Sequence, residues 1–406
     1  MGSTADAAHG ASQILPAEQE HARRSMMALV LLCIGHFFID TYSGALGALQ
    51  PRLVAKLGLT LTEAGFLGGA LIFASSLCQP LYGYWSDRYG TRLFSVLTPA
   101  VAGLGICLLG SAPNYASLFA CVLVGGAAIA AFHPQATSRV TRGLTASRGT
   151  WMAVFISSGT LGFALGPTYF SYAPEWLGLE HLYWAAIPGV LCSILLWFYL
   201  EPEPVDAGRR ARGFELAPLQ AVWKPLTILY FCVFIRSIVQ VTYAQLLPLY
   251  LHRERGLSVG EANLLLSGYL ACGALGGFTG GRLSDRIGGR RVIMVSMLGS
   301  VPFLLLFFGL SGWTSMAALL AGGLLLLFTI PVNVVMAQEL APAQSGTVSA
   351  LMMGFAWGLA GLIFIPLTGW LSDQFGMHAS LRALAVFPLI GFFLARMLPK
   401  ERRGHG

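Results

Sequence analysis

Several ionisable side chains lie within long apolar stretches of this sequence, and three of them come first. His36 and Asp40 fall in the first apolar stretch, and Arg236 falls in the seventh. Residues four apart share one face of a helix, so His36 and Asp40 should lie one above the other. A charged group in lipid costs free energy and normally faces a partner or a water-filled pathway. The pattern predicts proton exchange at His36 and Asp40, and anion binding at Arg236.

Further polar residues accompany these three. His133, in the sequence Phe132-His133-Pro134, can titrate near neutral pH, and the proline frees a backbone carbonyl. We assign it to proton coupling, with a hydrogen-bonded packing role as the alternative. Gln240 and Tyr243 follow Arg236 at helical spacing, and Asn333 lies in the second-half counterpart of the His133 stretch. The candidate substrate-binding residues are therefore Arg236, Gln240, Tyr243 and Asn333.

The elements that carry these residues are membrane-spanning helices. The chain is 55% hydrophobic and 11% charged over 406 residues. A helix needs roughly 20 apolar residues to cross a bilayer, and long apolar stretches exclude a barrel. We place twelve spans near residues 25–49, 61–84, 91–111, 115–139, 148–172, 180–200, 224–250, 260–283, 290–310, 312–337, 345–372 and 378–398.

Basic residues indicate the orientation. The net charge of +7 comes from short clusters between apolar stretches, so it indicates topology rather than nucleic-acid binding. With both termini cytoplasmic, the basic residues in the outer loops are only Arg52, Lys56, Arg253, Arg255 and Arg382.

The seven cysteines all fall in apolar stretches without metal-ligand spacing, so we expect no metal and no cofactor. The expected surroundings are a lipid bilayer, with the protein as a monomer.

The chain contains an internal repeat. Gly83-Tyr-Trp-Ser-Asp87-Arg88 recurs as Gly281-Arg-Leu-Ser-Asp285-Arg286, offset by 198 residues and placed in the second inner loop of each half. Charged groups there can form a latch that closes the inner side; ordinary turn chemistry is the alternative. We assign to gating the loop residues Gly83, Asp87, Arg88, Arg92, Asp285, Arg286 and Arg290.

The same offset places Arg236 within two residues of the counterpart of Asp40. Arg236 and Asp40 should therefore lie at similar depth in the membrane, with a structural ion pair between them as the alternative.

A glycine stripe runs along the fifth span. Gly159, Gly162, Gly166 and Pro167 lie on one helical face, and a similar stripe recurs in the eleventh span. We assign these four residues to gating, with generic close packing as the alternative. A third copy of the loop pattern, Gly369-Trp-Leu-Ser-Asp373, lacks the arginine and receives no assignment.

We expect two similar six-helix bundles with polar segments around them. Residues 1–24 should remain on the chain as a disordered tail, because they have no signal-peptide pattern. The expected divisions are 1–24 cytoplasmic tail, 25–200 first bundle, 201–222 cytoplasmic linker, 223–398 second bundle and 399–406 cytoplasmic tail.

The loop pattern resembles the signature of the major facilitator superfamily, and other stretches resemble its fosmidomycin-resistance family. These stretches are His36-x-x-x-Asp40, Ser75-Ser76-Leu-Cys-Gln79-Pro80 with the following motif, Phe132-His133-Pro134, and Ser158-Gly159 to Gly166-Pro167. The resemblance implies an all-α fold of two pseudo-symmetric bundles. It also implies efflux of small antibiotics from the bacterial cytoplasm across the inner membrane. The sequence Ser158-Gly159-Thr160 departs from the family's usual paired glycine and asparagine.

We therefore expect an exporter of small drug-like molecules that works by proton antiport. A proton-coupled uptake permease for a small organic anion is the alternative. A membrane hydrolase built on His36, Asp40 and His133 is disfavoured, because the chain has neither an HExxH nor a GxSxG motif. We expect a transporter and not an enzyme.

Overall fold

The computed structural model describes residues 5–89, 91–140, 148–202 and 217–399, and these residues contain helices and no strand. Eleven described segments are long and apolar enough to cross a membrane, and α7 (Arg148–Leu177) is a further helix of 30 residues. The predicted all-α membrane fold is confirmed. The other helices of the first half are α1 (Ala5–Ser43), α2 (Ala45–Leu57), α3 (Leu61–Ile72), η1 (Phe73–Leu77), α4 (Gln79–Tyr89), α5 (Leu93–Cys107), η2 (Leu108–Ser111), α6 (Tyr115–Val140), η3 (Leu179–Ala186) and α8 (Ile187–Tyr199).

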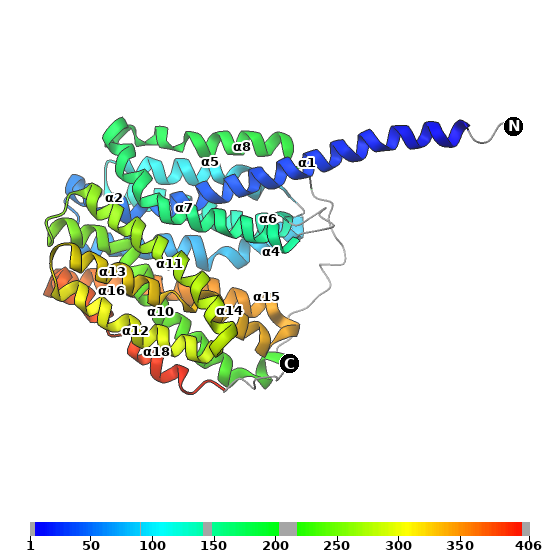
Figure 1. Ribbon diagram of the computed structural model, residues 1–406. Coiled ribbons are helices and arrows are strands. Elements are labelled where there is room, and N and C mark those ends of the chain that lie inside the picture. Colours follow the sequence, from blue (N-terminus) through cyan, green and yellow to red (C-terminus); the bar gives the residue numbers. More distant parts are fainter. Residues whose placement is uncertain (1–4, 90, 141–147, 203–216, 400–406) are drawn as a thin grey trace.

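The second half of the chain lies beside the first, with α1 to α8 along one side of the bundle and α10 to α18 along the other (Figure 1). Its helices are α9 (Ala217–Ala221), α10 (Trp223–Arg253), α11 (Val259–Ile287), α12 (Gly289–Gly309), α13 (Gly312–Leu326), α14 (Thr329–Leu340), η5 (Pro342–Gln344), α15 (Ser345–Ala350), η6 (Leu351–Phe355), α16 (Ala356–Phe375), α17 (Met377–Leu384) and α18 (Pro388–Ala395).

The repeat seen in the loop motif extends to helix ends. Thr60 and Ser258, again 198 residues apart, each close a capping box at the start of α3 and α11. Such a box satisfies backbone N–H groups that have no partner within the helix. Glycines with positive φ recur at the same offset, as Gly58 with Gly256 and as Gly178 with Gly376. The two halves therefore repeat each other in backbone detail as well as in motif.

The halves meet closely at one end of the bundle, which we call the far end: the end where α2 leads into α3. There α3 packs along α16, α7 along α11, and α2 along α10. Gly369 lies against the Leu61 carbonyl, and Gly65 lies against the Ile365 carbonyl, so that side chains at either position would force the helices apart. These glycines allow the two halves to approach each other closely at this end.

The opposite end carries the repeated loop motif, and we call it the motif end. There α4 packs on α6 of its own half. Asp285 is exposed, and among the described residues it forms no ion pair. The π-helical turns η1 and η6 contact each other where the α3 and α16 contact ends. Asp285, one carboxylate of the predicted latch, is thus without an ion pair to any residue that the structure describes.

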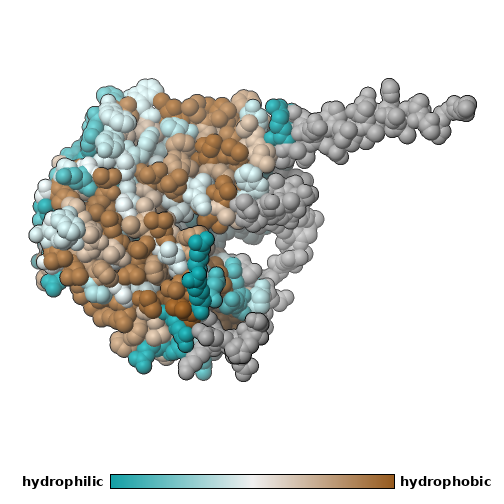
Figure 2. All heavy atoms as spheres, in the orientation of Figure 1, coloured by the Kyte–Doolittle hydropathy of each residue, from teal (hydrophilic) through white to brown (hydrophobic). Residues whose placement is uncertain are grey.

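The surface is apolar over a broad belt. Figure 2 shows apolar residues across the middle of the visible face, with hydrophilic residues gathered toward its margins. Large side chains that would be unusual on a soluble protein lie exposed, including Phe198, Phe278 and Phe393. Lipid is the medium in which such a surface is stable.

Two predicted boundary segments differ in the structure. The expected disordered tail, residues 1–24, is helical from Ala5 onward. It forms the first part of α1, which projects from the bundle (Figure 1). Its alanine, glutamine and glutamate content favours helix, which explains the difference. Of the expected linker 201–222, residues 203–216 lie outside the described residues, and α9 occupies 217–221. Residues 400–406 of the expected C-terminal tail also lie outside them.

Candidate functional site

A cavity of about 300 Å³ lies between the halves. Asp40 on α1, His133 on α6, Arg236 on α10 and Asn333 on α14 line it together. These four residues come from spans one, four, seven and ten, two from each half. The remaining lining residues are Ser43, Ser75, Ser76, Gln79, Ile129, Thr160, Phe163, Val233, Gln240, Ile330, Val334, Met352, Met353 and Trp357.

Asp40 lies between two histidines. His36 Nε2 is 3.3 Å from Asp40 Oδ2, and His133 Nε2 is 3.2 Å from Asp40 Oδ1. The other ring nitrogen of each histidine faces a backbone carbonyl at 2.8 Å, that of Phe155 for His36 and that of Ile129 for His133. Each histidine therefore bridges the carboxylate and a fixed backbone acceptor. We call these three side chains the His–Asp–His cluster.

Hydrogen counting shows what this cluster can do. A carbonyl oxygen only accepts, so each Nδ1 must carry its proton to satisfy the 2.8 Å contact. Each Nε2-to-carboxylate contact then needs one further proton, on either partner. The cluster has a net charge of −1 with neither of these protons, zero with one and +1 with both. It can therefore hold up to two exchangeable protons, and each proton that leaves removes the hydrogen bond of one nitrogen-to-oxygen contact.

Neighbouring helices hold the cluster in place. His36 is 7% exposed, and its ring stacks on Phe155 with centroids 4.1 Å apart. Gly159 of α7 passes directly over the cluster, so that a Cβ there would overlap His36 Nε2 and Asp40 Oδ2. Gly162 lies against the Phe37 carbonyl and Gly166 against the Thr41 carbonyl. The stripe assigned to gating packs α7 onto α1 within the first half, and Gly159 leaves room for the cluster.

Replacing Gly159 by Ala is expected to displace Asp40 and to abolish the pH dependence of transport. The added Cβ overlaps two atoms of the His–Asp–His cluster, and overpacking of this kind costs about 1–3 kcal/mol. Gly162→Ala is the matched control, because the three atoms nearest to its Cβ all belong to the Phe37 backbone and not to the cluster. The midpoint temperature of thermal unfolding should fall in both variants, whereas the pH profile of transport should change only in Gly159→Ala. An equal change in both profiles would contradict the assignment.

Arg236 does not pair with Asp40. Its guanidinium donates to the Gln240 Oε1 and to the Ser237 Oγ at 3.1 Å, and its Nε has no partner. Arg236 is 4% exposed and forms no ion pair among the described residues. The alternative of a structural ion pair with Asp40 does not hold in this conformation. A buried guanidinium without a counter-ion is costly, which favours binding of an anion in the cavity.

Of the other candidate substrate-binding residues, two line the cavity and one does not. Gln240 and Asn333 line the cavity, and both amide atoms of Asn333 are buried without a partner. Tyr243 is fully buried, donates to the Leu381 carbonyl at 3.1 Å, and packs near Tyr269 inside the second half. It shares the helical face of Arg236 but lies about two turns further along α10. Tyr243 is therefore not among the residues that we propose to contact substrate.

The loop-motif arginines bind helix ends. Arg92 donates to the Leu200 carbonyl, just past α8, and Arg290 donates to the Ala395 carbonyl at 3.3 Å and the Arg396 carbonyl at 2.6 Å, at the end of α18. Unpaired carbonyls at a helix C-terminus favour such cations. These equivalent contacts tie the third helix of each half to its last.

The other motif residues make contacts within their own half. Arg88 donates to the Tyr84 hydroxyl at 2.8 Å, and Gly83 lies near Pro134 of α6. Arg286, like Asp285, is exposed. The side chain of Asp87 lies outside the described residues. The gating assignment of these residues therefore stays a prediction.

Asp373 joins the two halves, although its sequence pattern received no assignment. At the far end its carboxylate accepts from the Leu61 N–H at 2.9 Å and the Thr62 N–H at 2.8 Å, and from the Thr62 hydroxyl at 2.5 Å. It thus caps the start of α3 in the other half, where the helix dipole also favours an anion. The third copy of the loop pattern was the available signal. Asp373 thus joins the two halves at the far end.

Replacing Asp373 by Asn is expected to open the far end more often. Loss of a carboxylate cap costs about 0.5–2 kcal/mol, which corresponds to a shift of roughly 2- to 30-fold in the equilibrium between the two access states. Distances between spin labels at Pro113 and Trp313, both exposed at the far end, would measure the shift. An unchanged distance distribution would contradict a gating role for Asp373.

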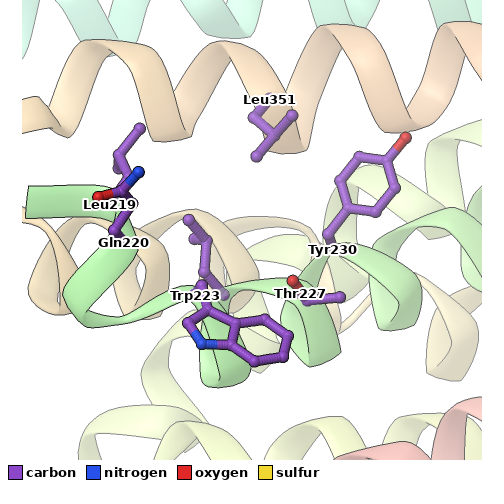
Figure 3. Close-up of a pocket in the computed structure, with 7 residues that line it drawn as sticks. Leu219, Gln220, Trp223, Thr227, Tyr230 and Leu351 are labelled. Atoms are coloured by element: carbon purple, nitrogen blue, oxygen red, sulfur yellow. The ribbon is translucent and has the colours of Figure 1, made fainter. Parts of the chain in front are cut away.

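A second cavity lies at the motif end. Figure 3 shows Leu219 and Gln220 of α9, with Trp223, Thr227 and Tyr230 of α10, facing Leu351 across the opening. Its volume is about 290 Å³, and Leu226 completes the lining. The phenol of Tyr230 is the one ionisable group among these described lining residues.

The sequence of the chain is similar to known membrane transporters. The Major Facilitator Superfamily pattern matches residues 32–250 and 229–406. The chain is 28% identical to the fosmidomycin resistance protein of Escherichia coli over 94% of its length and 95% of the relative's. It is 24% identical to a probable sulfoacetate transporter of Cupriavidus necator over 93% of its length and 96% of the relative's.

Solved structures share the fold. A bacterial homologue of the human lysosomal transporter Spinster, in an inward-facing and occupied conformation, superposes with a TM-score of 0.76 at 16% identity, covering 91% of this chain and 96% of that one. The nucleoside transporter NupG superposes with a TM-score of 0.72 at 15% identity, with 93% of this chain and 100% of that one covered. With its family match, its helical halves and the cavity between them, the chain belongs to the Major Facilitator Superfamily and is a membrane transporter rather than an enzyme.

Proposed function

We propose that this protein exports small drug-like molecules of the fosmidomycin type by proton antiport with alternating access. One observation supports the proposal: Asp40 and His133 of the His–Asp–His cluster line a single cavity between the halves together with Arg236, which forms no ion pair among the described residues. In this conformation the halves pack closely at the far end, whereas α4 at the motif end packs within its own half. We take this as the access state in which the far end is closed. Rocking of the halves would produce the other.

Antiport follows if substrate and protons compete for the cluster. A bound substrate that donates a hydrogen bond to Asp40 replaces a contact that a proton otherwise supplies, so each occupant favours release of the other. Thr160 and Gln79, which line the same cavity, offer further hydrogen bonds to a polar substrate. Export in this scheme draws its free energy from the inward proton gradient.

Arg236 defines the expected chemistry of the substrate. A guanidinium binds carboxylate or phosphonate through parallel hydrogen bonds, and Asn333 adds one donor and one acceptor with no other partner. The sequence similarity to the fosmidomycin resistance protein favours an antibiotic as substrate. The probable sulfoacetate transporter is named for an anion, which is in keeping with a guanidinium in the cavity.

Uptake of a small organic anion is the second candidate. Arg236 and Asp40 form no ion pair here, so an anion at Arg236 and a proton at Asp40 can be bound together, as symport requires. Substrate would then move with protons rather than against them. The cavity residues are the same in both schemes, and the sign of the coupling distinguishes them.

We further propose a multi-pass placement in a bacterial inner membrane, with both termini and the motif end facing the cytoplasm and the protein acting as a monomer. The excess of arginine at the motif end supports this orientation. The far end, closed by Asp373, then faces outward.

Proteoliposomes with an imposed pH gradient test the proposed function. Protein would be reconstituted in both orientations, and radiolabelled fosmidomycin or sulfoacetate would be followed inside and outside. Accumulation in vesicles with an acidic lumen supports antiport, because outward proton flow then drives substrate inward. Accumulation driven by an acidic exterior would instead establish symport and overturn the proposal of export.

A further inference from the structure

We propose that the His–Asp–His cluster is also a binding site for a divalent transition-metal ion such as Zn²⁺. Nothing in the proton scheme requires a metal, and the site follows from the donor atoms themselves. One ring nitrogen of each histidine and one Asp40 oxygen all lie within 4.8 Å of one another. Two imidazoles and a carboxylate are the ligand set of open zinc sites.

The ligand spacing fits a small ion. The two nitrogen-to-oxygen distances are 3.3 Å and 3.2 Å. Ligands about 2.0–2.1 Å from a tetrahedral ion lie about 3.3 Å from each other. The two distances end on different oxygens of Asp40, so each histidine already lies at this spacing from one carboxylate oxygen. An ion bound to both nitrogens would take both oxygens of the carboxylate or require the carboxylate to turn.

The second contacts of the histidines prepare them for this role. Histidines that bind metal commonly donate their other ring N–H to a carbonyl or carboxylate, which fixes the ring and the tautomer. His36 Nδ1 faces the Phe155 carbonyl and His133 Nδ1 faces the Ile129 carbonyl, each at 2.8 Å. With Nδ1 protonated, the lone pair of each Nε2 points toward Asp40. Two lone pairs then face the two oxygens of one carboxylate, an arrangement that a cation stabilises.

Access and selectivity also follow from the geometry. Asp40 and His133 line the central cavity, so an ion can enter from it and keep a water as its fourth ligand. Imidazole ligands favour Zn²⁺ over Mg²⁺, which prefers oxygen. A bound ion would occupy the atoms that we propose exchange protons, and so would inhibit transport. The binding itself does not depend on the direction of transport.

Binding would be measured by isothermal titration of Zn²⁺ into detergent-solubilised full-length protein made without a polyhistidine tag. One equivalent is expected, with Mg²⁺ giving no heat. His36→Gln and His133→Gln should each weaken Zn²⁺ binding by more than about tenfold. His252→Gln is the control, because this exposed histidine lies on α10 beyond the cavity and should leave binding unchanged.

X-ray absorption at the zinc edge gives a second readout that does not depend on the variants. Two imidazole ligands with oxygen ligands, and no sulfur, support the site. Stoichiometric binding that survives both histidine substitutions would overturn it, as would a spectrum with cysteine sulfur or no binding at all. Each of these results leaves the proton antiport proposal intact, because that proposal is tested by gradient-driven transport.

Discussion

Replacing Asp40 by Asn is expected to abolish proton-driven accumulation while leaving substrate exchange across the membrane. The amide keeps the shape of the carboxyl group but can neither bind nor release the proton. A pH gradient can therefore no longer drive substrate movement. His36 and His133 then keep their carbonyl contacts and lose their shared carboxylate. Accumulation against a gradient should fall to the level of empty vesicles, measured with labelled substrate under an imposed pH difference.

The exchange measurement serves as the control for this variant. Counterflow with equal pH on both sides needs binding and rocking of the halves but no net proton movement. Asp40→Asn protein that exchanges substrate is therefore folded and mobile. Normal accumulation by this variant would remove Asp40 from the coupling mechanism.

Replacing Arg236 by Gln is expected to weaken binding of an anionic substrate. Loss of a hydrogen bond from a charged donor costs about 1.5–3 kcal/mol, which corresponds to roughly a 10- to 150-fold rise in Kd. Stability should not fall in parallel, because the variant also removes a buried charge with no ion-pair partner among the described residues. Titration calorimetry with fosmidomycin and with sulfoacetate would measure the first effect, and thermal unfolding the second.

Arg52→Gln is the matched comparison for Arg236. Arg52 pairs with Glu175 at 3.1 Å at the far end and does not line the cavity. Its loss should reduce stability slightly and leave the Kd unchanged. Equal affinity of wild-type and Arg236→Gln protein for both anions would show that the guanidinium does not bind substrate.

Most of the fold could be predicted from the sequence because lipid imposes long apolar helices and the chain repeats itself. The 198-residue offset seen in the loop motif recurs in the capping boxes of Thr60 and Ser258. The spacing of His36 and Asp40 also placed both on one face of α1, where they pair. Local periodicity is sufficient for contacts within one helix.

Contacts between helices were less predictable. On another helix, Asp40 contacts His133 of α6, which the packing of α6 against α1 brings close, whereas the expected equal depth left an ion pair with Arg236 as the alternative. Tyr243 shows a related limit, because periodicity gives the face of a helix and not the distance along it at which the cavity ends. Asp373 was missed because its partner, the start of α3, lies in the other half of the chain.

The most direct test is the sign of the proton change when substrate binds. Weakly buffered, detergent-solubilised protein with a pH indicator would be mixed with saturating fosmidomycin, with Asp40→Asn protein as the blank. The account predicts that wild-type protein acidifies the solution, because substrate displaces protons from the cluster around Asp40. Proton uptake, or an equal signal from both proteins, would contradict it.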